Sequence, residues 1–161
     1  MKYVSSIIMV SNLGKSRHFY EDILHQIVKF DFGYNITYEG DFAIQQPSYF
    51  RRMAGTNFPK NGKSNRSSRA VLYFESDEVQ ACERRLRRLD VQFIHGIQEQ
   101  HWGQRVFRCY DPDGYIIEIG ETREELVLRL AGEGLSLDEI CSKSGYPESF
   151  VSPLLESDNQ E

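Results

Sequence analysis

One carboxylate stands out among the residues that could do chemistry. Glu118 lies between Ile117 and Ile119 in an apolar run, and alternation along a β-strand places its side chain on the opposite face from both isoleucines. A carboxylate at such a position is either solvated or held for a purpose, because burying it without a partner is costly. As a base, it could accept a proton from a substrate. Glu118 is therefore the candidate catalytic residue.

A β-hairpin is expected to position this carboxylate. The sequence DPDG at residues 111–114 has proline where a type I turn fixes φ and glycine where the chain leaves the turn with φ > 0. Residues 105–110 before the turn and 115–119 after it are rich in β-forming side chains.

The register of the hairpin decides what faces the carboxylate. A bulge at Gly114 would put Arg108 opposite Glu118 on the same face, with Tyr110 beside Ile116. The two charged residues would then form either a structural ion pair or the polar part of a ligand site. The sequence leaves both readings open.

Two motifs resemble a known superfamily. The stretch QEQHWGQRVFRCYDPDGYIIEIGE at 98–121 resembles the closing part of the vicinal oxygen chelate superfamily, and its WGQR sequence looks most like the glyoxalase and bleomycin-resistance branch. The superfamily also includes fosfomycin-modifying enzymes and extradiol dioxygenases. The sequence SRHFYEDIL at 16–24 is similar to the "SRxFYxDxLG" helix of the same proteins. The resemblance covers residues 1–120.

Two stretches of the chain have the same order of elements. Residues 1–47 show the pattern of a strand, a helix over 14–28 and three short strands, and residues 70–120 repeat this order with a helix over 79–89. The resemblance implies an α+β fold in which paired βαβββ modules form a cupped, barrel-like mixed sheet. We expect residues 48–69 to be an irregular basic loop, serving as a mobile linker or a functional segment.

The resemblance also implies where a metal would bind. The superfamily's ligand positions in the first strands of the modules fall on Ser5 and Val71, and the position in the closing strand falls on Glu118. The first module offers Gln45 at best. A catalytic divalent site needs at least three donors and an open position. We therefore expect no metal and no cofactor.

Without a metal, the expected site is a ligand pocket in the cup. Its polar groups would converge in an otherwise aromatic surrounding. A planar aromatic ligand would stack well on Trp102, although a single Trp is also a common core residue. The ligand-binding residues expected around Glu118 are Arg108, Tyr73, Tyr110, Trp102 and Ser5.

Two classes of function fit these expectations. The first is a metal-free small-molecule binding protein, similar to bleomycin-resistance proteins that sequester a drug without changing it. The second is a glyoxalase-like lyase or isomerase that uses Glu118 as a base. A homodimer is expected in both cases, because cups in this superfamily are often completed or flanked by a second chain.

Composition and charge exclude other classes. The net charge is −5, and residues 121–161 carry three basic and ten acidic side chains, which argues against a nucleic-acid surface there. No apolar run approaches the roughly 18 residues needed to cross a bilayer. The N-terminus lacks the apolar stretch of a signal peptide. The cysteines are three in number and scattered, as expected of free thiols in a reducing cytosol, so the predicted location is cytoplasmic.

Residues 121–161 are expected to form a separate helical tail. Thr122 can cap a first helix, and Ser136-Leu137-Asp138-Glu139 has the sequence of a capping box that opens a second. The sequence SLDEICSKSGYPESFV resembles a helix-turn-helix, but its acidic character argues against DNA binding. We expect the apolar faces of the tail to cover the body of the protein or a partner subunit.

Overall fold

The computed structural model describes residues 4–54 and 70–158, and the chain divides into two compact units. The first unit comprises residues 1–68 together with 111–115, and the second comprises 69–110 and 116–161. Each unit contains one four-stranded mixed sheet, built from a βαβββ order of elements. The predicted α+β class and internal repeat are confirmed.

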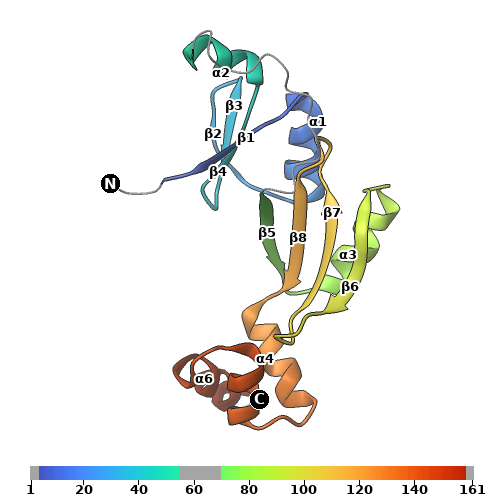
Figure 1. Ribbon diagram of the computed structural model, residues 1–161, viewed down its shortest axis with the longest axis vertical. Coiled ribbons are helices and arrows are strands. Elements are labelled where there is room, and N and C mark those ends of the chain that lie inside the picture. The colour runs from blue at the N-terminus through green and yellow to red at the C-terminus, as the bar shows by residue number, and fades with distance from the viewer. Residues whose placement is uncertain (1–3, 55–69, 159–161) are drawn as a thin grey trace. The chain divides into compact units, whose positions relative to one another are not determined.

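The first unit carries the N-terminal module (Figure 1). Its elements are β1 (Ser6–Met9), α1 (Leu13–Arg17), η1 (His18–Ile23), β2 (Val28–Asp31), β3 (Asn35–Tyr38), β4 (Phe42–Gln45) and α2 (Pro47–Ala54). The strand order is β1-β4-β3-β2. β1 runs parallel to β4, and the other neighbours are antiparallel.

The helix of this module is shorter and wider than the sequence predicts. After α1 the chain continues as the π-helix η1, in which the Leu24 N–H donates to the Phe19 carbonyl five residues back. The helix stops at Ile23, and His25 then adopts a φ of 55°. Hydrophobic periodicity predicts a helix up to 28 but carries no information on the wider turn.

Aromatic packing joins this helix to its sheet. The Tyr20 ring lies 5.4 Å from the Phe42 ring and 6.0 Å from the Tyr38 ring, measured between centroids. The Tyr38 and Phe42 rings stack at 4.9 Å. All three side chains are buried, so this cluster forms the core of the first unit.

The expected loop at 48–69 begins as a helix. α2 spans Pro47–Ala54, with proline at the first helical position, where its fixed φ suits a helix and its missing N–H has no cost. The prediction of irregular structure is therefore wrong for 48–54. Residues 55–69 lie outside the described part of the chain.

The second unit carries the other module and the tail. Its elements are β5 (Val71–Ser76), α3 (Val79–Arg88), β6 (Phe93–Glu99), β7 (Arg105–Tyr110), β8 (Ile116–Glu121), α4 (Arg123–Gly132), α5 (Leu137–Ser144) and α6 (Glu148–Asp158). The strand order is β5-β8-β7-β6, with β5 parallel to β8. We call this sheet the second sheet.

The register of the β7–β8 hairpin agrees with the prediction. Arg108 pairs with Glu118, Tyr110 pairs with Ile116, and Gly114 has a φ of 85°. β6 continues to Glu99, so residue 95 lies inside the strand.

The turn of this hairpin is organised by a buried carboxylate. Asp111 Oδ1 accepts hydrogen bonds from the backbone N–H groups of Asp113 and Tyr115, at 2.9 and 2.8 Å. Asp111 Oδ2 accepts a third from the hydroxyl of Tyr20, at 2.8 Å. Burial raises the pKa of Asp111, against the effect of these donors.

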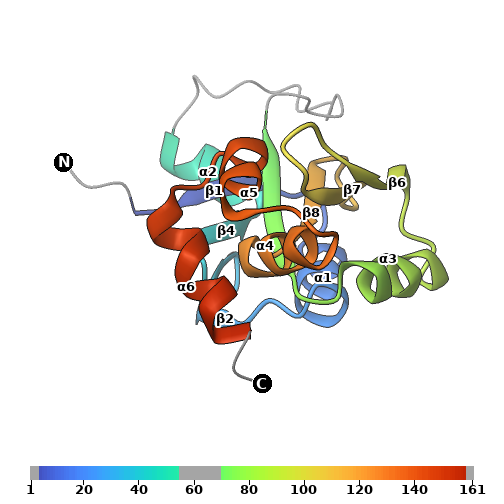
Figure 2. The ribbon, with the colours of Figure 1, turned by 90° about the horizontal axis from the view of Figure 1, so that it is seen from below.

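The tail forms a small helical bundle in the second unit. Figure 2 shows α4, α5 and α6 packed around one another. Their common core consists of Leu126, Val127, Leu130, Ile140 and Val151, all buried. The predicted caps are confirmed, since Thr122 accepts from the Glu125 N–H and Ser136 forms a capping box with Glu139.

Within the described ranges, no helix combines the length and apolarity needed to cross a membrane.

We predict that removing the Asp111 side chain destabilises the protein more than neutralising it. Asp111→Ala should lower the free energy of unfolding by about 2–3 kcal/mol, because three donors lose their buried acceptor. Asp111→Asn should cost less than about 1 kcal/mol, since the amide oxygen can keep both backbone bonds. Chemical denaturation at neutral pH measures both values. The control, Asp22→Ala, removes an exposed carboxylate and should change stability by less than about 0.5 kcal/mol.

The wild-type protein and Asp111→Asn should also differ in how their stability depends on pH. Because the pKa of Asp111 is raised above its ordinary value of 3.8, the folded chain holds this proton at a pH where the unfolded chain has lost it. Ionisation of Asp111 therefore removes stability as the pH rises from 3.8 through the raised pKa. The wild-type protein should lose stability relative to Asp111→Asn over this window, and parallel curves would contradict the assignment.

Candidate functional site

The candidate site is a row of polar side chains across the second sheet. Tyr73 of β5 pairs with Glu118 of β8, Glu118 pairs with Arg108 of β7, and Arg108 pairs with His95 of β6. Directly paired residues lie on the same face of a sheet, so one row crosses all four strands. We call the face that carries these four residues the polar face.

The opposite face of the second sheet is apolar and lies against α3. Phe107 and Cys109, which alternate with Arg108 along β7, are fully buried. The Phe93 ring stacks on Phe107 at 5.4 Å, and the guanidinium of Arg87 from α3 lies 4.3 Å from the Phe93 ring centroid. Alternation along β7 and β8 therefore places Arg108 and Glu118 on the face opposite this packing.

An ion pair occupies the centre of the row. Arg108 Nε donates to Glu118 Oε2 at 2.6 Å, and Arg108 Nη2 also contacts this oxygen. The Glu118 side chain is 18% exposed and that of Arg108 is 27% exposed, so the pair is partly shielded from water. The expected pairing of the two residues is confirmed. Both contacts are to Oε2, and no described residue donates a hydrogen bond to Glu118 Oε1.

His95 extends this pair on the other side. Arg108 Nη1 lies 2.9 Å from His95 Nε2, and His95 Nδ1 lies 2.7 Å from the Gly96 carbonyl oxygen. A guanidinium can only donate and a carbonyl can only accept, which assigns the neutral imidazole with its proton on Nδ1. Arg108 therefore bridges a carboxylate and a neutral histidine.

Tyr73 closes the row on the β5 side. Its hydroxyl accepts from Gln104 Nε2 at 2.6 Å and donates to Glu75 Oε1 at 3.1 Å. Burial raises the pKa of Tyr73 to about 12, although the Gln104 donor acts in the opposite direction. The phenol is neutral at physiological pH, and its proton is directed to Glu75.

The other predicted residues are not members of this row. Tyr110 lies on the polar face next to Ile116, two positions from Arg108. Trp102 lies in the turn between β6 and β7, where its Nε1 donates to Gln104 Oε1 at 3.1 Å. Ser5 belongs to the first unit, where its hydroxyl donates to the Ser6 carbonyl.

Sequence reasoning missed two members of the site. His95 lies inside β6, which continues to Glu99, and it pairs with Arg108. Gln104 is buried and contacts both Tyr73 and Trp102, and the WGQR motif was the available signal for it.

The repeat shows what the first module has at the corresponding positions. α1 and α3 begin 66 residues apart, which aligns Ile7 with Tyr73. Ile7 pairs with Ala43 as Tyr73 pairs with Glu118, so Ala43 is the counterpart of Glu118. Gln45 lies two residues further along and is not the equivalent position. Its Oε1 accepts from Asn35, and its buried Nε2 has no hydrogen-bond partner within the described residues.

The donor set does not fit the metal that the superfamily implies. Val71 has no donor atom, Ser5 offers only a hydroxyl, and Glu118 already holds a guanidinium. Over residues 4–54 and 70–158, no group of three or more His, Cys, Asp or Glu side chains is arranged to hold a metal ion. A catalytic divalent ion requires at least three such donors.

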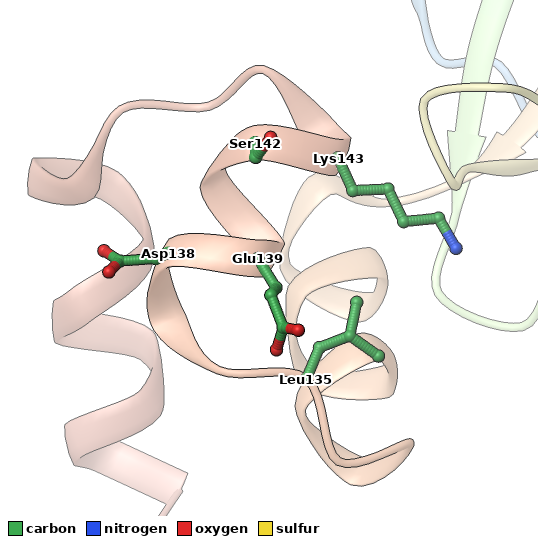
Figure 3. A pocket seen from close by; sticks show the side chains of 5 residues that line it. All are labelled: Leu135, Asp138, Glu139, Ser142 and Lys143. Carbon is green, nitrogen blue, oxygen red and sulfur yellow. The ribbon is translucent and has the colours of Figure 1, made fainter.

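A hollow lies on the tail. It has a volume of about 430 Å³ and is lined by Leu135, Asp138, Glu139, Ser142 and Lys143 (Figure 3). Two of its charged groups already have structural roles, since Glu139 caps α5 and Lys143 Nζ donates to Glu99 at 2.8 Å. We assign no ligand to this hollow.

We predict strong coupling between Arg108 and Glu118. Glu118→Gln and Arg108→Met should each lower the free energy of unfolding by about 2 kcal/mol, because each leaves a partly buried charge unpaired. The double variant should lose less than the sum of the two. Urea denaturation of the four proteins measures the coupling. Lys29→Met, which breaks an exposed ion pair with Asp41, is the control, and purely additive effects of the Arg108 and Glu118 variants would contradict the prediction.

Comparisons with known proteins agree with this fold. The chain matches the glyoxalase-like domain family over residues 3–124. A protein of unknown function from Agrobacterium tumefaciens strain C58 has 34% sequence identity and a TM-score of 0.68, over 76% of this chain and 94% of that chain. No curated protein matches the chain.

More distant structures show the fold alone. A lactoylglutathione lyase from Agrobacterium tumefaciens has 19% identity and a TM-score of 0.57, over 74% of this chain and 92% of its own. A member of the glyoxalase/bleomycin resistance protein/dioxygenase superfamily from Sphaerobacter thermophilus has 23% identity and a TM-score of 0.57, over 76% and 98%. The chain therefore belongs to the glyoxalase-like domain family, within the vicinal oxygen chelate superfamily that its hairpin and first helix resemble.

Proposed function

We propose that the protein binds a small molecule on the polar face of the second sheet, without the catalytic metal of its superfamily. The observation that carries this proposal is the row of Tyr73, Glu118, Arg108 and His95, which places four different hydrogen-bonding side chains in register on one face. Binding sites commonly combine a few convergent polar groups with an apolar surround.

The chemistry of the row indicates the kind of ligand. The charges of Arg108 and Glu118 cancel, and His95 is neutral, so the row as a whole favours a ligand without a large net charge. Apolar surface lies beside it, because Val71 is 49% exposed and Tyr73 is 45% exposed on the same face. A small aromatic molecule with a donor for Glu118 Oε1 would satisfy both features.

The competing function is a glyoxalase-like lyase or isomerase. One feature favours it: Glu118 Oε1 carries no hydrogen bond from a described residue, so this oxygen could take a proton from a bound substrate. The two functions differ in turnover, since a binding protein returns its ligand unchanged.

We predict that the purified protein binds aromatic compounds and does not turn over hemithioacetals. A thermal-shift screen of aromatic antibiotics should find at least one compound that raises the melting temperature, because a ligand of the folded state stabilises it. The shift should be lost in Glu118→Gln and kept in Lys29→Met. Metal analysis of the same sample should find less than one equivalent of zinc, nickel, manganese or iron per chain.

Each arm can reject one part of the proposal. Steady turnover of a hemithioacetal panel that is abolished in Glu118→Gln would establish the enzyme instead. One equivalent of metal that is lost in the same variant would overturn the metal-free site. A screen without any stabilising compound would count against the ligand class.

We also propose that the functional form is a homodimer. Several large apolar side chains of the first unit are exposed, and a second copy of the chain would cover them. They are Val4, Ile7, Ile27, Phe30 and Phe32. Light scattering at micromolar concentration should give twice the mass of the 18.7 kDa chain. A monomer under these conditions would contradict this proposal without affecting the ligand site.

A further inference from the structure

A chain of hydrogen bonds connects the C-terminal helices to the polar face. It begins at Arg129 of α4, whose Nη2 donates to Glu121 Oε1 and to the Gly103 carbonyl oxygen, both at 2.6 Å. Arg129 Nε donates to Glu121 Oε2 at 3.1 Å. The Arg129 side chain is 14% exposed and that of Glu121 is 6% exposed, so this junction is well shielded from water.

The next link is Gln104, which follows the glycine held by Arg129. Gln104 Nε2 donates to the Glu121 carbonyl oxygen at 2.8 Å and to the Tyr73 hydroxyl at 2.6 Å. Its Oε1 accepts from Trp102 Nε1. Both donors and the acceptor of this amide are therefore used, which leaves the side chain one orientation.

Gly120 makes this arrangement possible. A Cβ atom at this position would lie 2.8 Å from Gln104 Nε2 and 3.1 Å from the Tyr73 hydroxyl. Any larger residue would push the amide away from the phenol, so the close approach depends on glycine.

The last link is Tyr73 itself, the neighbour of Glu118 in the row. Its hydroxyl accepts from Gln104 and donates to Glu75, so the phenol proton is already committed. What Tyr73 can offer to a ligand is mainly its half-exposed ring. An aromatic ring stacks on such a surface without requiring a proton.

We propose that the C-terminal helices position the ligand site: Arg129 fixes the turn at Gly103 and Gln104, and Gln104 fixes the Tyr73 ring as a stacking surface for an aromatic ligand. The proposal rests on the ligand site proposed above, and it assigns Arg129 and Gln104 as positioning residues. Helix α4, which supplies Arg129, lies mostly beyond residue 124, where the match to the family ends. Arg129 therefore lies outside the part of the chain that matches the family.

The single Trp allows a direct test by nuclear magnetic resonance. Trp102 is the only Trp in the chain, so its indole N–H gives one signal that reports the bond to Gln104. In Arg129→Met, this signal and the ring signals of Tyr73, identified by their loss in Tyr73→Phe, should shift, and the indole proton should exchange faster with solvent. Unchanged signals in Arg129→Met would overturn the proposal.

Two further variants separate positioning from simple loss of stability. Ser136→Ala removes the capping box of α5 and should lower the melting temperature while leaving both sets of signals in place. Arg129→Lys keeps a positive charge beside Glu121, but an ammonium cannot reproduce the guanidinium fork that also reaches Gly103. Arg129→Lys should therefore still shift the indole signal. A wild-type indole signal in Arg129→Lys would show that a positive charge beside Glu121 is enough, and would contradict the positioning role of the guanidinium.

Titration with 2-naphthol, a neutral aromatic probe, tests the ring contact. It should shift the Tyr73 ring signals of the wild-type protein, and its affinity should fall about fivefold in Arg129→Met, the effect expected from losing one ordering hydrogen bond. Ser136→Ala should bind it like the wild type. If the wild type shows no shift at Tyr73 while Arg129→Met still perturbs the indole signal, the ring contact is rejected and the positioning role stands.

Discussion

The ion pair between Arg108 and Glu118 is the interaction on which the polar face depends. A carboxylate within the apolar strand β8 is stable only if a donor faces it, and the hairpin register supplies the Arg108 guanidinium from the neighbouring strand. The remaining donors of that guanidinium then reach His95 on the next strand. The charge of Glu118 on β8 thus requires Arg108 on β7, and Arg108 in turn contacts His95 on β6.

The two modules share a topology but not a chemistry. The first module has Ile7 and Ala43 where the second has Tyr73 and Glu118. An isoleucine and an alanine offer no donor or acceptor beyond their backbone, so the polar row is a property of the second module alone. This asymmetry is also why the residues present do not fit the superfamily's metal, whose ligands come from both modules.

The tail also supplies partners for charged side chains of the second sheet. Glu121 ends β8 in a buried position, where its carboxylate accepts from the Arg105 N–H and forms an ion pair with Arg129 of α4. Lys143 of α5 similarly donates to Glu99 at the end of β6, and this bond lowers the pKa of that carboxyl. The ends of two strands of the second sheet are therefore bound to the helices that follow them.

The sequence by itself determined the α+β class, the repeat, the caps of the tail helices and the pairing of Arg108 with Glu118, because periodicity and turn residues are local signals. Only the tertiary structure decided the rest. The π-helix at His18–Ile23 and the helix at Pro47–Ala54 are departures that local propensity does not encode. His95, Gln104 and Arg129 joined the site because hydrogen bonds between residues up to 31 positions apart depend on how the strands and helices pack, and residue type alone cannot reveal that geometry.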